Sequence, residues 1–356
     1  MTLNFWEGKK VFLTGHTGFK GSWLSLWLQS LGAELTGYAL TPPTTPNLFS
    51  VANVAEGMRS VIGDIRDLDQ LKKTVKESNP DVVIHMAAQP LVRYSYANPV
   101  ETYATNVMGT VHILEAARES KSIKAILNVT SDKCYENREI DRGYKEDEAM
   151  GGFDPYSNSK GCAELVTSAY RNSFFNIEKY KDHGVALATA RAGNVIGGGD
   201  WAEDRLIPDF MRAIEVKQKV FIRNPHAIRP WQHVLEPLQG YLMLCQKLYE
   251  NGPSFSQSFN FGPDEKDARS VEWIAGELIK TLGEGASYEI NSNHSSLHEA
   301  HFLKLDCAKA RIQIGWQPKW DIHIALDKIC TWHKANLKGE DMHLYSLNDI
   351  KIYTLQ

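Results

Sequence analysis

The sequence has few of the features that mark metal-binding, secreted or membrane proteins. Five cysteines are an odd number in 356 residues, and no CxxC pair occurs, so neither a zinc site nor a disulfide framework is expected. No apolar run is long enough to span a bilayer, and the first ten residues lack the apolar core of a signal peptide. These absences predict a reduced, soluble, cytoplasmic protein with no bound metal and no membrane partner.

An excess of charge of one sign is also absent. Lysine and arginine number 39 and aspartate and glutamate 43, which gives a formal net charge of −4. This balance gives no electrostatic reason to expect nucleic acid as a partner, so an anionic ligand must be held by local basic residues. Because 43% of residues are hydrophobic and 23% charged, disordered and fibrous classes are excluded.

Short apolar runs alternate with segments of helical period in the first half of the chain. Runs at 10–13, 34–40, 82–84, 125–127 and 186–190 are typical of buried strands, with helices expected near 67–78 and 99–119. This alternation predicts an α/β fold with a Rossmann-type, doubly wound parallel sheet. After about residue 195 glycines and prolines cluster and the elements shorten. We therefore expect a Rossmann domain over 1–195, to which part of 230–262 returns, and a smaller, interleaved C-terminal substrate-binding lobe over 196–356.

A glycine-rich turn follows the first predicted strand. The segment 14–21 reads TGHTGFKG, and its glycines permit a tight turn and close approach of a phosphate to the N-terminus of the next helix. Its spacing is GxxGxxG rather than GxGxxG, so a tight turn without a ligand is the alternative. The position between a strand and a helix favours binding of a dinucleotide.

Two later strand ends extend the predicted cofactor site. The segment GDIRD (63–67) places an acid where it could meet an adenine amino group, and HMAAQ (85–89) has small side chains against which a cofactor could lie. The acid expected about 20 residues past the glycines is missing, so Thr41 or a neighbour must contact the ribose, and no arginine there could receive a 2′-phosphate, which favours NAD over NADP. The predicted cofactor-binding residues are Gly15, Thr17, Gly18, Phe19, Lys20, Asp64, Ile65, Ala87, Ala88 and Gln89, together with Tyr156 and Lys160.

The segment YSNSK places Tyr156 and Lys160 on one helix face. The ammonium, with the positive nicotinamide ring, is expected to lower the pKa of the phenol so that it can act as a base. The alternative is an exposed Tyr–Lys pair without function. With the glycine turn, the Ala-Ala strand end and Ser131, the segment resembles the extended short-chain dehydrogenase/reductase family of NAD-dependent epimerases and dehydratases. The resemblance implies that Tyr156 deprotonates a sugar hydroxyl while hydride passes to NAD⁺, and that Lys160 binds the nicotinamide ribose.

The trio Ser131-Asp132-Lys133 indicates the branch of the family. Epimerases of the family lack the acid, whereas its nucleotide-sugar 4,6-dehydratases have Thr-Asp-Glu at these three positions. A lysine at the third position, as in Lys133, resembles the dehydratases that act on CDP-glucose. Long segments at 154–157, 160–165, 190–201, 204–209 and 228–234 carry the same likeness. It implies C4 oxidation of CDP-D-glucose, loss of water across C5/C6 and hydride return to C6, giving CDP-4-keto-6-deoxy-D-glucose. The predicted catalytic residues are Ser131, Asp132, Lys133, Tyr156 and Lys160. A 4-epimerase, a dehydratase of another nucleotide-hexose and a non-catalytic NAD sensor remain open.

Basic residues of the second lobe are candidates for contacts with the substrate. Arginine can form bidentate hydrogen bonds to phosphate, which an acidic protein needs in order to hold a diphosphate sugar. The predicted substrate-binding residues are Asn194, Arg205, Leu206, Arg223, Arg229 and His233. Helices near 99–119 and 156–175 carry apolar faces that pair across a two-fold axis in this family, so a homodimer or homotetramer is expected.

Overall fold

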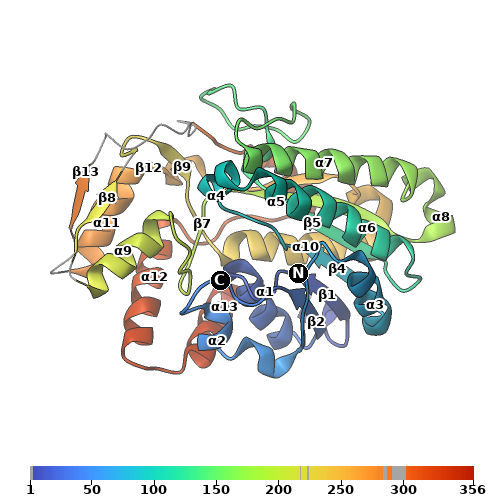
Figure 1. The fold of residues 1–356 in the computed structure, drawn as a ribbon, viewed down its shortest axis with the longest axis horizontal. Helices are drawn as coiled ribbons and strands as arrows, with labels where there is room; N and C mark the ends of the chain where they lie inside the picture. The colour runs from blue at the N-terminus through green and yellow to red at the C-terminus, as the bar shows by residue number, and fades with distance from the viewer. Residues whose placement is uncertain (1–2, 217, 223, 284–286, 291–301) are drawn as a thin grey trace.

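Seven parallel strands form the central sheet in a computed structural model that describes residues 3–216, 218–222, 224–283, 287–290 and 302–356 (Figure 1). Their order is β11-β6-β5-β4-β1-β2-β3. They are β1 (Lys10–Thr14), β2 (Glu34–Ala39), β3 (Arg59–Ile62), β4 (Val82–His85), β5 (Ala125–Val129), β6 (Ala186–Ala192) and β11 (Ser258–Phe261). The winding changes direction between β1 and β4, and ligands of such sheets bind at the carboxyl ends of the strands beside this point.

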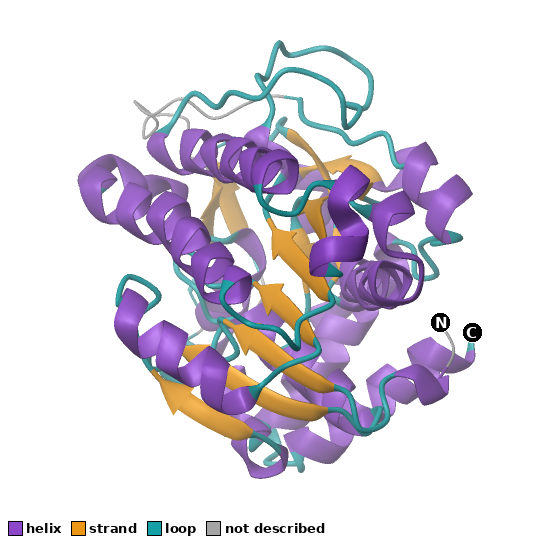
Figure 2. Ribbon diagram, turned by 90° about the vertical axis from the view of Figure 1, so that its right-hand side faces the viewer, coloured by secondary structure: helices purple, strands orange, loops and turns teal. Residues whose placement is uncertain are grey.

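Helices cover both faces of the sheet (Figure 2). One face packs against α1 (Phe19–Ser30), α10 (Leu235–Asn251) and α13 (Met342–Leu355), and the other against α3 (Leu68–Ser78), α6 (Gly109–Arg118) and α7 (Pro155–Ser173). Every residue of β4, β5 and β6 is therefore buried. Continuous apolar runs are typical of strands covered on both faces.

A second core lies beside the carboxyl edge of the sheet, at the left of Figure 1. It is built by α9 (Leu206–Glu215), α11 (Val271–Leu282) and α12 (Ile322–Leu337) with β8 (Val220–Ile222) and β13 (Tyr288–Ile290). Short pairs join it to the rest: β7 (Val195–Ile196) with β10 (Gln232–His233), and β9 (Ile228–Pro230) with β12 (Ala268–Ser270). After β10 the chain forms α10, which packs on the main sheet, and β11, which is its edge strand, before it returns to this second core.

Shorter elements complete the chain. They are η1 (Leu3–Phe5), α2 (Leu48–Val51), η2 (Val54–Gly57), α4 (Val92–Ala97), α5 (Pro99–Tyr103), the π-helical segment η3 (Ala104–Met108), η4 (Asp132–Cys134), η5 (Ile177–Lys179), α8 (Tyr180–His183), η6 (Gly252–Phe255), η7 (Glu265–Asp267) and a second π-helical segment, η9 (Ala310–Ile314). Among the helices of the described ranges, none combines the length and apolar character needed to cross a bilayer.

The predicted α/β class with a doubly wound parallel sheet is confirmed. The five predicted runs are strands, and the strand end predicted before GDIRD (63–67) is that of β3. β11 at the other edge of the sheet was not predicted, because its four residues include the polar Ser258 and Asn260 and form no long apolar run. The helix expected near 99–119 is a continuous run of α5, η3 and α6.

Candidate active site

The glycine turn joins the carboxyl ends of β1 and β4. Gly15 has a φ of +80°, and a β-carbon there would lie 2.8 Å from the Ala87 nitrogen. A β-carbon on Gly21 would lie 2.0 Å from the Gly15 oxygen, so both positions require glycine. Gly18 is different, because a side chain there would meet only the Gly15 oxygen, at 3.4 Å. As the N-cap of α1 without a side-chain cap, Gly18 leaves the positive helix end open to a phosphate.

Side chains around this turn fix its position. The Thr14 hydroxyl accepts hydrogen bonds from the Met86 and Ala87 nitrogens (3.0 and 3.1 Å) and lies 2.7 Å from His85 Nδ1. Thr17 donates to the Leu40 oxygen (2.8 Å), which ties the turn to the end of β2. The predicted contact residue Thr17 therefore already has an internal partner for its hydroxyl proton.

The remaining predicted cofactor residues lie along the same edge. Asp64 forms a bidentate pair with Arg66 (2.6–3.0 Å), and this hydrogen bonding lowers the pKa of the carboxyl group. Ile65 is buried against Gly109. Gln89 is held by internal hydrogen bonds to the Leu91 backbone and to Thr102, while Ala87 and Ala88 are half-buried.

The predicted catalytic trio begins directly after β5. The Ser131 hydroxyl donates to Asp132 Oδ1 (3.0 Å) and accepts from the Lys133 nitrogen (3.2 Å), which shapes the short helix η4. Asp132 is buried, and among the described residues no group donates to its Oδ2 atom. Burial raises the pKa of Asp132, against the lowering effect of Lys133 and of the Ser131 hydrogen bond. A buried carboxyl group with a raised pKa is suited to donate a proton.

Gly193 provides the surface on which this carboxyl group packs. A β-carbon at position 193 would lie 1.8 Å from Asp132 Oδ2. The next residue, Asn194, has a φ of +40°, and its carbonyl accepts from the Gln232 nitrogen (3.3 Å). The Gln232 side chain donates to the Gly193 carbonyl (3.2 Å), so the backbone facing Asp132 is held in place.

Helix α7 brings Tyr156 and Lys160 to the trio. Asp154 caps the helix by accepting from the Ser157 nitrogen (2.9 Å), and the Lys160 ammonium donates to the Val129 oxygen at the end of β5 (3.3 Å). Burial lowers the pKa of Lys160 to about 8. The N-terminal half of α7 thus places the Tyr156 phenol and the Lys160 ammonium at the carboxyl edge of the sheet, beside the end of β5.

The predicted lowering of the Tyr156 pKa by Lys160 and the nicotinamide ring together stays a prediction, since the chain without cofactor shows the effect of its own groups alone. Burial raises the pKa of Tyr156 to about 12, and the groups that oppose this rise are the Ser131 hydrogen bond and the charge of Arg205. A positive charge from a bound cofactor is therefore needed before the phenol can act as a base near neutral pH.

Lys20 and Tyr241 also lie at this edge, and Tyr241, which belongs to α10, was not predicted as a site residue. The Lys20 ammonium donates to the Tyr241 hydroxyl (3.1 Å), so Lys20 reaches past the glycine turn. Burial, together with the charges of Lys160 and Arg205, lowers the pKa of Lys20 to about 7. Tyr241 is fully buried in the middle of an apolar helix, where no local motif marks it as part of a site.

The predicted substrate residues that the structure describes come from several elements of the second lobe. Arg205 pairs with Asp200 (2.8 Å) and its charge acts on Tyr156, whereas the charge of Arg229 acts on Asp132. Leu206 begins α9, and Arg223 lies outside the described residues.

His233 occupies a position in the core. It is 1% exposed, and its ring contacts Trp23 and Trp320 edge to face, with centroid separations of 6.2 and 4.8 Å. Burial lowers the pKa of His233 to about 3. Its place between α1 and the C-terminal segment supports packing rather than contact with a ligand.

Comparison with known proteins shows the family of the chain. The sequence model described as GDP-mannose 4,6 dehydratase matches residues 12–329. The chain belongs to this dehydratase family. It is 58% identical over 351 residues to the CDP-glucose 4,6-dehydratase of Salmonella typhimurium, covering 98% of this chain and 97% of the relative.

Solved structures show that the fold is shared with other enzymes of nucleotide sugars. MoeE5 in complex with UDP-glucose and NAD superposes with a TM-score of 0.76 at 23% identity, covering 92% of this chain and 99% of that one. The UDP-glucose 4-epimerase of Stenotrophomonas maltophila with bound NAD and formylated UDP-arabinopyranose gives 0.79 at 18% identity, covering 93% and 99%. The predicted extended short-chain dehydrogenase/reductase architecture is thereby confirmed for this dehydratase-family chain.

Proposed function

We propose that the protein is a lyase that converts CDP-D-glucose to CDP-4-keto-6-deoxy-D-glucose, using NAD that is restored within each turnover. The observation that carries this proposal is the buried acid Asp132, placed between the Ser131 hydroxyl and Lys133 at the end of β5. An epimerase needs no acid at this position, since no hydroxyl group leaves. The choice of CDP-glucose is supported by the relative of that name at 58% identity.

Residues of the carboxyl edge fit a dinucleotide. The uncapped N-terminus of α1, with Gly18, would receive the pyrophosphate. Asp64 and Ile65 follow the carboxyl end of β3 at the same edge of the sheet. Lys160 would hold the nicotinamide ribose. When bound, NAD⁺ supplies the hydride acceptor and a positive ring. The solved relatives that contain NAD support this assignment.

The chain's own groups divide the proton transfers between them. Tyr156 as phenolate takes the proton of the 4-hydroxyl group while C4 is oxidised. The resulting 4-keto group acidifies the C5 proton, which Lys133 removes in its neutral form, and protonated Asp132 gives its proton to the departing 6-hydroxyl group. Bound NAD would supply the hydride for C6, and Lys133 returns its proton to C5. Each transfer uses a group that is held at the same end of the sheet.

Contacts with the diphosphate sugar are proposed for the second lobe. Arg205 reaches the reaction centre from the start of α9, and Arg229 approaches it from β9. Both can form charge-assisted hydrogen bonds to phosphate oxygens, and Asn194 lies beside the backbone that faces Asp132. Arg223, Leu206 and His233 remain predictions, of which His233 has the least support because of its burial.

We also propose a homodimer or homotetramer in the cytoplasm. Apolar side chains are exposed on α5 and η3 and on α7, with Val100 82% and Leu165 59% exposed, as the surface of a subunit contact requires. All five cysteines lie in the described part and are free thiols, which suits a reducing compartment. Sedimentation analysis of the parent and of Val100→Glu with Leu165→Glu tests the assembly, since loss of subunits from the double variant is expected.

Product analysis tests the function. The purified protein with NAD is incubated with CDP-, UDP-, GDP- and dTDP-glucose, and products are measured by mass spectrometry. Loss of one water from CDP-glucose, with no accumulation of free NADH, is the expected result. An isomer of unchanged mass would identify an epimerase, and stoichiometric build-up of NADH would exclude both readings.

A further inference from the structure

A buried ion pair links helix α7 to strand β6 of the sheet. The Glu164 carboxylate on α7 accepts a hydrogen bond from the Arg191 guanidinium on β6 (2.8 Å), and the two side chains are each 3% exposed. Burial favours the neutral form of the acid, but the charge and hydrogen bond of Arg191 hold the pKa of Glu164 below its usual value. The pair is therefore ionised, although neither partner takes part in the proton transfers proposed above.

The acidic partner is bonded to the start of segment 130–135, which contains the predicted catalytic trio. Thr130, which directly precedes Ser131, donates its hydroxyl proton to Glu164 Oε1. Thr189 on β6 donates to Oε2 of the same carboxylate (2.8 Å). Glu164 thus joins α7 both to the sheet and to the residue at which the catalytic segment begins.

The basic partner holds the other end of segment 130–135. Arg191 donates from Nη1 to the Tyr135 hydroxyl (2.7 Å) and from Nη2 to Glu164 Oε2 (2.8 Å). Tyr135 follows directly on the short helix η4, is 1% exposed, and donates its own proton to Asn260 Oδ1 (2.7 Å). Because a guanidinium presents its donors in a rigid fork, one arginine fixes the carboxylate and the phenol relative to each other.

Segment 130–135 also lies directly against the backbone of α7. A β-carbon on Gly161 would be 3.1 Å from the Cys134 oxygen, so the helix and η4 are in close contact there. Lys160 precedes this glycine, and Glu164 lies one turn further along the same helix. A shift of α7 relative to this segment would therefore move Lys160 relative to the trio.

We propose that Glu164 and Arg191 are positioning residues, which hold the acid and base of segment 130–135 in register with the phenol and ammonium of α7. This role rests on the proposed function, because Asp132 and Lys133 are both needed only if water is eliminated. A displacement of about 1 Å can lower the rate of a reaction by about 10²-fold, so a contact that fixes both ends of the segment has a direct effect on catalysis.

The alternative is an ion pair that only stabilises the packing of α7 on β6. A buried pair loses hydration free energy that offsets much of its attraction, so stability alone is a weak reason for its presence. If it were the whole reason, the Thr130 and Tyr135 hydroxyl groups would matter no more than that of Thr189, which binds the same carboxylate from β6. Removing either charged partner would leave the other buried and unpaired and would destabilise the fold, so the test keeps the pair intact.

Two variants each remove one link between the ion pair and segment 130–135. Thr130→Val removes the hydroxyl group bonded to Glu164, and Tyr135→Phe removes the one bonded to Arg191. In steady-state assays with CDP-glucose and NAD, each is expected to lower kcat by about 10-fold and the double variant by about 10²-fold. The KM for the sugar nucleotide and the affinity for NAD are expected to stay near the parental values, because the proposed phosphate contacts lie on other elements.

Matched controls remove a hydroxyl group of the same kind without cutting a link. Thr189→Val takes away a donor to Glu164 that belongs to β6. Tyr144→Phe alters the ring that stacks on Tyr135 (5.2 Å between centroids), while its hydroxyl group donates to Asn137 Oδ1 (3.0 Å). Both controls are expected to keep the parental kcat.

The step that slows separates positioning from a general loss of structure. Asp132 and Lys133 act in the elimination, whereas Tyr156 acts in the oxidation of C4. The two link variants should therefore accumulate bound NADH during turnover, which the absorbance of the cofactor measures, and the parent and controls should accumulate less.

The outcomes are distinct. Link variants that match the controls in kcat and in bound NADH would overturn the positioning role alone, provided that the parent dehydrates CDP-glucose. Slowing of the link variants without bound NADH would also overturn it, because oxidation and elimination would then be impaired alike. If the parent forms no dehydrated product, the proposed function itself fails, and this role fails with it. Circular dichroism and urea unfolding of each variant confirm that the fold is retained under the assay conditions.

Discussion

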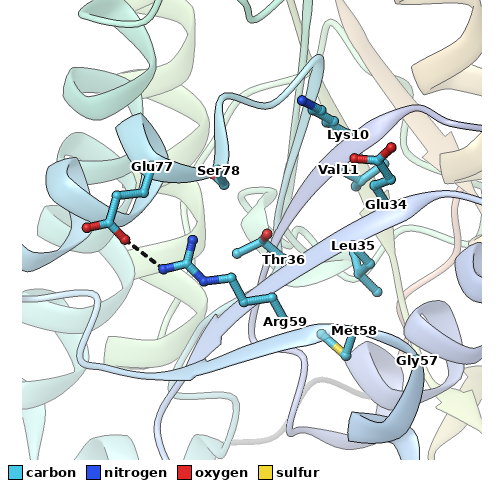
Figure 3. Close-up of a pocket in the computed structure, with 10 residues that line it drawn as sticks. All are labelled: Lys10, Val11, Glu34, Leu35, Thr36, Gly57, Met58, Arg59, Glu77 and Ser78. Atoms are coloured by element: carbon cyan, nitrogen blue, oxygen red, sulfur yellow. Dashed lines mark hydrogen bonds and ion pairs between the residues drawn. The ribbon is translucent and has the colours of Figure 1, made fainter.

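The two ends of the same strands carry polar groups in opposite settings. At the carboxyl edge, Asp132 and Lys160 are buried, and burial shifts the pKa of each group toward its neutral form. At the amino edge, a surface hollow of about 450 Å³ is lined by the charged side chains at the start of β1, β2 and β3 and the end of α3 (Figure 3). Its lining residues are Lys10, Val11, Glu34, Leu35, Thr36, Gly57, Met58, Arg59, Glu77 and Ser78.

Charge alone does not distinguish these two edges. In the hollow, Arg59 pairs with Glu77 at 2.6 Å, and both side chains are about half exposed, so water stabilises their charges. At the carboxyl edge, α7 and α10 cover the strands, and Asp132 is buried from water. The protonation state of this carboxyl group can therefore change during a reaction. Burial that is only partly compensated is what distinguishes the carboxyl edge, and no group in such a setting lines the hollow at the amino edge.

Removing the phenol should have the largest effect. Tyr156→Phe is expected to lower kcat by about 10²–10⁴, as is typical when a positioned base is deleted, while NAD binding is largely kept. Tyr170→Phe, on the same helix but bonded to Glu115, is the matched control. Steady-state kinetics and cofactor titration measure both. Near-parental activity of the Tyr156 variant would show that another group starts the reaction.

Lys133→Ala should stop the reaction after oxidation of C4. NADH is then expected to accumulate in the bound form with a 4-keto sugar, because no base remains for the C5 proton. Asp132→Asn should stall at a related point, since the leaving hydroxyl group lacks a proton donor. Single-turnover absorbance and exchange of deuterium at C5 follow these steps. Rapid exchange at C5 in Lys133→Ala would assign the base to a different residue.

Gly193→Ala tests whether packing at the carboxyl edge controls the acid. Its β-carbon would overlap Asp132 Oδ2, so the carboxyl group must move and the unfolding free energy should fall by about 1–3 kcal/mol, with a lower kcat. Gly276→Ala on α11 is the control, because nothing lies within 4 Å of its added β-carbon. Denaturant unfolding compares the two variants. Equal activity and stability of both variants would contradict the proposed role of Gly193.

Changes at the amino edge should have the smallest effect. Arg59→Ala breaks the exposed pair with Glu77, and we expect kcat and the thermal midpoint to stay unchanged within error. Arg205→Ala at the other edge should lower activity, since its charge acts on Tyr156. A clear loss of activity in Arg59→Ala would show that the hollow participates in function.

Local sequence patterns predicted most of the sheet and the strand ends at which the candidate site residues lie. Strands such as β4 and β5 consist mainly of apolar residues, so their burial follows from composition. Gly15 and Gly21 are required by close backbone contacts around one turn. β11 was missed because this edge strand lacks a long apolar run. The formation of such an edge strand depends on pairing with a strand that is distant in the sequence.

The sequence by itself therefore determined the class of fold and the glycine turn and indicated the candidate pair Tyr156 and Lys160, because each depends on patterns of residues that are close in the chain. Only the tertiary structure decided the electrostatic state of the site. Tyr241 from α10 and Gly193 after β6 meet Lys20 and Asp132 across the edge of the sheet. The pKa of a buried group depends on the loss of water and on charges brought in by other elements, and these are properties of the packed chain.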